Sequence, residues 1–113
     1  MNSDKNIMAT FAGPSLTVTS PNGGEGWNPG TFKKITWAYT GNPGAYVRIE
    51  LLKGDILHSI IASNTGKGFN GKGTRYWRIP KDLPAGSDYK IQITSTTNGA
   101  HTDMSDNTFT ITP

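Results

Sequence analysis

The chain has 113 residues and no cysteine, which excludes disulfides, thiolate nucleophiles and cysteine-ligated metal sites. Its length suits one domain, and a hydrophobic fraction of 34% with 14 glycines and 7 prolines favours a thin, turn-rich β-sandwich over a helical fold. The formal net charge is +3, and the stretch 64–81 holds several cations and no acidic residue.

The first residues differ in character from the rest of the chain. Residues 1–14 contain Asp4, Lys5 and Asn6 and no apolar stretch of signal-peptide length. We predict a flexible leader or an inter-domain linker over 1–14 and one folded domain over 15–113. No apolar run in the chain is long enough to span a membrane, so we expect no direct membrane insertion.

The first four expected strands are marked by apolar residues that alternate with polar ones. They cover residues 16–19, 34–39, 47–51 and about 56–62. Trp37 falls on the apolar face of the second strand. The Ser-Pro-Asn-Gly-Gly sequence at 20–24 ends the first strand, and Gly54-Asp55 has the sequence of a two-residue hairpin turn with glycine first.

Three more strands follow a glycine-rich stretch at 64–73, which we expect to be a loop. They cover residues 76–79, 89–94 and 108–112. Trp77 falls in phase with apolar residues, whereas Tyr76 and Arg78 share the opposite face. Seven short strands without alternating helices predict an all-β antiparallel sandwich of the immunoglobulin or fibronectin-III kind, with Greek-key connections.

The start of the strand at 89–94 carries a further signal. The pair Asp88-Tyr89 is typical of the tyrosine corner of Greek-key sandwiches, in which the hydroxyl bonds a nearby backbone group. We therefore predict a structural role for Tyr89.

Five segments together are similar to one known family. They are TVTSPNGGE at 17–25, ITW at 35–37, VRIELLKG at 47–54, WRIP at 77–80 and GSDYKIQI at 86–93. This pattern, which covers nearly all of the chain after Pro14, resembles the yeast cell-wall-synthesis N-terminal domain family, also described as Ser/Thr-rich glycolipid-anchored membrane proteins.

The resemblance implies an immunoglobulin-like sandwich outside the cell or at its surface, associated with the cell wall. Fungal members are linked to β-glucan assembly, and bacterial and archaeal members are repeated modules in large exported proteins. The resemblance supplies no catalytic residue.

One motif match has to be rejected. Residues 66–71 fit G-x-G-x-x-G, but a dinucleotide site needs this motif to open a helix whose N-terminus receives the pyrophosphate. Here β-rich sequence follows, so we expect neither a nucleotide nor any other cofactor.

Three tryptophans in a small β domain raise the question of carbohydrate binding, because flat rings stack on sugars. Trp37 and Trp77 fall in phase with the core. Trp27 lies in a turn-like segment that shows no apolar–polar alternation. The first interpretation is that it caps the end of the core, and the alternative is that it stacks on a ligand. Tyr76, together with Tyr46 and Phe69, is the better candidate for an exposed platform.

The basic residues near the fifth strand could attract an acidic polysaccharide, a teichoic-type polymer or nucleic acid. The members of this cluster are Lys67, Lys72, Arg75, Arg78 and Lys81. Arg78 should share an outward face with Tyr76. A solvated surface is the simpler interpretation. Nucleic acid is not expected, because the sequence shows neither a reading helix nor an aromatic sheet motif.

Metal and catalytic signals are weak. Asp103, Asp106 and Asn107 offer fewer oxygens than calcium requires, so a polar turn is the first interpretation and a structural calcium site the alternative. His58 and His101 neighbour no recognisable serine–carboxylate arrangement. We therefore expect no catalytic residue and no enzyme.

Two hypotheses of function remain, both for an extracellular or cell-surface location. The first is a non-catalytic interaction or spacer module that contacts neighbouring domains of a larger surface protein. The second is an accessory module that binds a cell-wall or acidic polysaccharide. Its candidate ligand-binding residues are Tyr76, Arg78, Trp27, Lys72, Arg75 and Phe69. A binding module should expose at least two coplanar aromatic rings, whereas a spacer should bury all three tryptophans under a surface rich in threonine and lysine.

Overall fold

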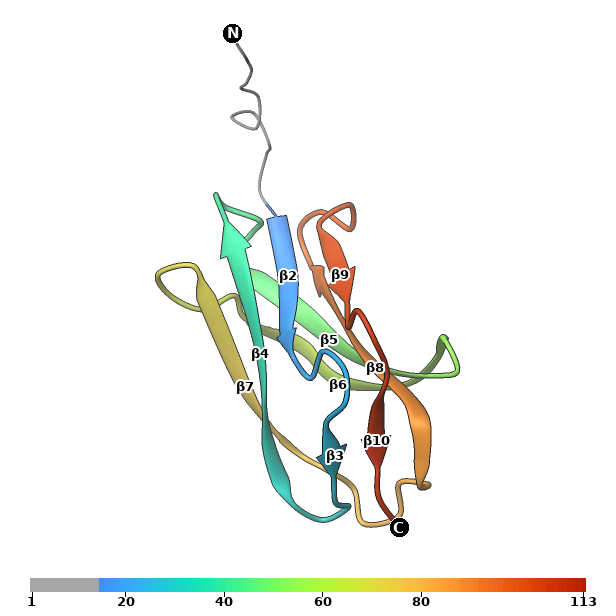
Figure 1. Ribbon diagram of the computed structural model, residues 1–113. Coiled ribbons are helices and arrows are strands. Elements are labelled where there is room, and N and C mark those ends of the chain that lie inside the picture. Colours follow the sequence, from blue (N-terminus) through green and yellow to red (C-terminus); the bar gives the residue numbers. More distant parts are fainter. Residues whose placement is uncertain (1–14) are drawn as a thin grey trace, which may run out of the picture.

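The computed structural model describes residues 15–113, which form two β-sheets packed face to face (Figure 1). The leader or linker predicted over 1–14 lies outside the described residues. The strands are β2 (Ser15–Ser20), β3 (Gly26–Trp27), β4 (Phe32–Thr40), β5 (Tyr46–Lys53), β6 (Ile56–Gly66), β7 (Lys72–Arg78), β8 (Gly86–Ser95), β9 (Thr102–Met104) and β10 (Phe109–Ile111). Within 15–113 no helix is long and apolar enough to cross a membrane.

The smaller sheet has the order β2-β4-β7, and the larger has the order β3-β10-β8-β5-β6 with β9 also paired to β8. The chain changes sheet five times: between β2 and β3, β3 and β4, β4 and β5, β6 and β7, and β7 and β8. Connections of this kind produce a Greek-key sandwich. The predicted all-β immunoglobulin-like fold is therefore confirmed.

One pairing departs from the predicted antiparallel pattern. After β2 the chain leaves the smaller sheet, and β3 joins β10 of the larger sheet in a parallel pair, with Ile111 opposite Trp27. The strands β3 and β9 were not predicted, because a two-residue strand and the sequence Thr-Asp-Met show no alternation of buried apolar and exposed polar residues.

The glycine-rich stretch is more ordered than predicted. β6 continues to Gly66 and β7 begins at Lys72, which leaves only five residues between the two strands. Asn70 and Gly71 have φ values of 54° and 81°, as a type I′ turn requires, and Phe69 pairs with Lys72 across it. The residues after the G-x-G-x-x-G match thus form a strand, as expected.

The core lies between the sheets and is formed by the inward residue of each alternating pair. Its members are Leu16, Val18, Trp27, Ile35, Trp37, Val47, Ile49, Leu51, Ala62, Trp77, Ile79, Leu83, Tyr89, Ile91, Ile93, Phe109 and Ile111. Full burial of one Val, Leu or Ile side chain contributes about 1.5–3 kcal/mol. The predicted core positions of Trp37 and Trp77 are confirmed, with 1% and 6% exposure.

Two local predictions are also confirmed. The Tyr89 hydroxyl donates to the Pro84 carbonyl at 2.6 Å, which is the tyrosine corner. Lys53 pairs with Ile56 across the Gly54-Asp55 turn, and both turn residues have φ of 62°, the combination found in type I′ hairpins.

Hydrogen bonds from polar side chains close the side of the sandwich where β2 meets β9. The Val18 N–H of β2 donates to the Asp103 carboxylate at 2.8 Å. The buried Ser105 hydroxyl donates to the Pro21 carbonyl at 2.5 Å and accepts from the Ile91 N–H at 3.0 Å. The loop after β2 is thereby fixed to the loop after β9.

Candidate functional site

The two sheets differ sharply in charge. Strands β2, β4 and β7 carry no Asp or Glu, and their cations are Lys33, Lys34, Lys72, Arg75 and Arg78. On the larger sheet each cation lies near a carboxylate, in the pairs Arg48–Glu50, Lys53–Asp88 and Lys90–Asp55. In the described part of the chain none of the five cations on the smaller sheet forms an ion pair. Three of these cations, Lys34, Lys72 and Arg78, alternate with buried residues and so lie on the outer face of the smaller sheet, which has no carboxylate on its own strands.

The register of β4 and β7 sets the outward side chains of this surface in rows. Phe32 lies opposite Arg78, and Lys34 lies opposite Tyr76. Because Trp77 is buried, its neighbours Tyr76 and Arg78 point outward, and antiparallel partners share a face. Aromatic and cationic side chains therefore alternate in both directions.

The two aromatic rings of these rows are open to solvent. Phe32 and Tyr76 are each 64% exposed, and they are diagonal neighbours in the register. Diagonal neighbours across an antiparallel pair lie about 7–8 Å apart. The Arg78 guanidinium carbon lies 5.8 Å from the centre of the Phe32 ring, a cation–π arrangement that covers one face of Phe32. In the described part of the chain no cation lies over the Tyr76 ring, so we take Tyr76 as the platform.

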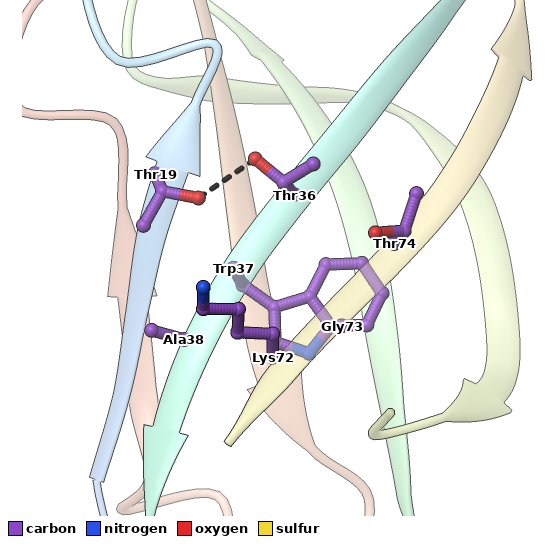
Figure 2. A pocket seen from close by; sticks show the side chains of 7 residues that line it. All are labelled: Thr19, Thr36, Trp37, Ala38, Lys72, Gly73 and Thr74. Atoms are coloured by element: carbon purple, nitrogen blue, oxygen red, sulfur yellow. Dashed lines mark hydrogen bonds between the residues drawn. The ribbon is translucent and has the colours of Figure 1, made fainter. Parts of the chain in front are cut away.

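A shallow hollow of about 380 Å³ adjoins these rows (Figure 2). Thr19, Thr36 and Thr74 contribute hydroxyl groups to its wall, and the Lys72 side chain borders it. The Thr19 and Thr36 hydroxyls share a hydrogen bond of 2.7 Å, shown as the dashed line. The hollow exists because small residues of β4 and β7, Ala38 among them, line its floor.

The structure brings together three of the six predicted ligand-binding residues. Tyr76, Arg78 and Lys72 all lie on the outer face of the β2-β4-β7 sheet, as their spacing of two or four residues along β7 requires. Arg75 has the opposite phase, and its Nη1 donates to the Thr65 hydroxyl of β6 at 3.3 Å. Arg75 therefore belongs to the open side of the sandwich and not to this face.

The remaining two predicted residues lie elsewhere. Phe69 is 79% exposed at the turn between β6 and β7, where it pairs with Lys72 at the far end of the hollow from Tyr76. Trp27 is 8% exposed, with ring centres 6.4 Å from Trp77 and 5.4 Å from Phe109. Trp27 packs into the core, which fits its first interpretation as a cap, and it lies apart from the outer face of the β2-β4-β7 sheet.

Several members of the face were missed in the sequence. Phe32 and Lys34 stand in phase with each other and out of phase with buried Ile35, so alternation placed them outward. Nothing local shows that they meet Arg78 and Tyr76, which lie more than 40 positions along the chain. The three threonines of the hollow were overlooked for the same reason.

The acidic turn has a structural explanation. Asp103 accepts the Val18 N–H, and the Asp106 carboxylate accepts from the Asn22 side-chain amide at 3.1 Å. Asn22 in turn accepts the Asp106 N–H at 2.8 Å. Among residues 15–113 no three His, Cys, Asp or Glu side chains gather as a metal site would require.

The fold and the site together define an immunoglobulin-like β-sandwich module with one cationic, aromatic-bearing face. The family model of the Kre9/KNH-like N-terminal Ig-like domain matches residues 20–112, and the chain belongs to that family. The family is linked to cell-wall synthesis and is secreted and cell-wall-associated. No curated protein matches the chain.

Proposed function

We propose that this domain is a non-catalytic interaction or spacer module of an extracellular or cell-surface protein. The observation that carries the proposal is the position of its two ends. β2 begins at one end of the sandwich, and the chain after β10 leaves at the opposite end (Figure 1). A module of this shape separates the two neighbouring domains by its own length. Those neighbouring domains are its proposed partners.

The buried polar side chains support the non-catalytic part of the proposal. Ser95 and Ser105 are the buried polar residues among 15–113, and both hydroxyls bond backbone groups. Ser95 accepts from the N–H groups of Thr97 and Asn98 at 3.1 Å and so shapes the turn after β8. These two hydroxyl groups therefore fix the conformation of loops through their hydrogen bonds to the backbone.

The spacer role can be tested by joining two copies of the chain in tandem and recording small-angle X-ray scattering. An end-to-end arrangement should nearly double the longest dimension of one copy. A tandem protein no longer than a single copy would contradict the proposal. A mixture of the two unlinked copies at the same concentration is the control for association.

A second candidate function is carbohydrate binding, and the hollow beside Tyr76 favours it. Threonine hydroxyls can exchange hydrogen bonds with sugar hydroxyls, and an exposed ring can stack on a sugar face. Affinity electrophoresis against β-glucan, chitin-derived and acidic polysaccharides tests this function. Retardation that Tyr76→Ala abolishes would support it. Tyr46→Ala, which removes an exposed aromatic residue from the other sheet, is the matched control.

A further inference from the structure

We propose that the outer face of the β2-β4-β7 sheet binds an acidic polysaccharide that runs along β7. Lys72, Lys34 and Arg78 would hold its anionic groups, and Tyr76 would stack on one of its sugar rings. This inference deepens the carbohydrate-binding candidate and rests on it. It adds the chemical class of the ligand, its direction on the sheet and its minimum length.

The class of ligand follows from the charge of the face. Its cations have no carboxylate partners in the described part of the chain, whereas the cations of the other sheet do. Unpaired like charges within a Debye length of about 8 Å repel one another, and a bound polyanion relieves that repulsion. A neutral glucan would leave this repulsion in place.

The direction follows from the period of the strand. Lys72, Thr74, Tyr76 and Arg78 are successive outward residues of β7, and outward residues repeat about every 6.6 Å along a strand. The terminal cations Lys72 and Arg78 are therefore about 20 Å apart along β7. A single sugar cannot reach both of them, but an extended chain of several sugars can.

The local chemistry fits a sugar that carries a carboxylate. Lys34 is the cross-strand neighbour of Tyr76, so a ring stacked on Tyr76 has an ammonium group at its edge. Arg78, one outward position along β7, presents a planar guanidinium that can bind a carboxylate through two parallel hydrogen bonds. Between Tyr76 and Lys72 lies Thr74 on the wall of the hollow, where hydroxyls can meet sugar hydroxyls.

The same features disfavour single-stranded nucleic acid. Such ligands are bound by series of aromatic side chains on which successive bases stack. Tyr76 is the one outward aromatic side chain of β7, and the guanidinium of Arg78 lies over the ring of Phe32 on β4. Between Tyr76 and Lys72 the face offers the threonine-walled hollow instead, which is better matched to hydroxyl-bearing sugars.

The test is affinity electrophoresis of the 113-residue chain in gels that contain polygalacturonate, neutral β-glucan or poly-dT, at low and high salt. We expect retardation by polygalacturonate that weakens at high salt, and little by the other two. Oligogalacturonates should compete with increasing strength until their length reaches about 20 Å, the separation of Lys72 and Arg78 along the strand.

Matched variants distinguish binding at this face from an effect of the net charge of the protein. Arg78→Ala and Lys34→Ala should each weaken polygalacturonate binding about tenfold, since each removes a charge-assisted hydrogen bond. Arg48→Ala removes the same charge from the other sheet and should leave binding nearly unchanged. Thermal unfolding of each variant checks that the fold is intact.

Each other outcome overturns the inference in a different way. If Arg48→Ala and Arg78→Ala lost equal amounts of polygalacturonate binding, the binding would be an effect of net charge. If poly-dT retarded the chain as much as polygalacturonate does, the face would be a general polyanion-binding surface. Salt-resistant binding to neutral β-glucan would keep the carbohydrate-binding function but reject the acidic class. No retardation in any gel would reject both and leave the spacer function alone.

Discussion

The indole ring of Trp37 lies against the backbone of Gly73, its partner on the neighbouring strand β7. A Cβ atom built on Gly73 would overlap the indole atoms Cε2 and Nε1. The ring has little room to withdraw, because Trp37 is 1% exposed and its Nε1–H donates to the Lys67 carbonyl at 2.8 Å. Glycine at position 73 therefore allows the indole ring of Trp37 to lie directly under the hollow.

Gly73→Ala should lower the free energy of unfolding by about 1–3 kcal/mol, the usual cost of forcing an extra methyl group into a packed core. Urea denaturation followed by tryptophan fluorescence measures the change. Gly99→Ala is the control, because nothing lies within 4 Å of a Cβ at that position. Equal stability of the two variants would contradict the tight packing of Trp37 on β7.

Ser105→Ala should destabilise the domain by about 1–3 kcal/mol, because it leaves the Ile91 N–H and the Pro21 carbonyl without their side-chain partner in a buried position. The loop that it fixes contains the SPNGGE sequence, so this prediction assigns that signature a structural role. Ser87→Ala, at an exposed position of β8, is the control and should change stability by less than about 0.5 kcal/mol. A similar urea midpoint for both variants would argue against that role.

Period-2 alternation was sufficient to predict seven of the nine described strands, the core positions of Trp37 and Trp77, and the outward direction of Tyr76 and Arg78. These features depend on neighbours two residues apart, which the sequence shows directly. The candidate site depends on which strands become neighbours and in which register. Lys34 meets Tyr76 only because β4 pairs with β7 in this register, and a shift of one strand by one residue would turn its side chain to the opposite face.

Loops and short strands were harder to predict for a related reason. The role of Asn22 is decided by Asp106, 84 residues away, and β3 exists because it pairs with β10 near the end of the chain. Such contacts have no local pattern. The phase of Arg75 was visible in the sequence, but its approach to Thr65 on the other sheet was not.

Tyr89→Phe should cost about 1 kcal/mol of stability, the scale of one hydrogen bond, because the ring stays in the core while the bond to the Pro84 carbonyl is lost. Polysaccharide retardation should not change, since Tyr89 is far from solvent. Tyr76→Phe provides the opposite control: its hydroxyl lies on an exposed side chain, and its removal should leave the urea midpoint unchanged. A loss of stability that is equal in the two variants would remove the special role of the tyrosine corner.

The ion pair between Lys53 and Asp88 should make stability depend on pH at both extremes. Lys53 Nζ lies 2.7 Å from Asp88 Oδ1, and this hydrogen bond is the main reason why the pKa of Asp88 is lowered and the pKa of Lys53 is raised. A lowered carboxyl pKa means that the stabilisation is present above the ordinary Asp value of 3.8 and is lost as the pH falls through the lower folded-state value. A raised lysine pKa means that it is present below 10.5 and is lost as the pH rises through the higher folded-state value.

Asp88→Asn should therefore be less stable than the unaltered chain by a constant amount between about pH 5 and pH 9, and this difference should shrink below about pH 4 and above about pH 10.5. Melting temperatures of both proteins across this range measure it, at low salt because both side chains are partly exposed and screened by ions. Asp55→Asn, which removes the longer contact to Lys90 of 3.5 Å, is the control and should show a smaller difference. A difference between Asp88→Asn and the unaltered chain that stays the same at pH 3 and pH 7 would mean that Asp88 acts through its shape and not through its charge.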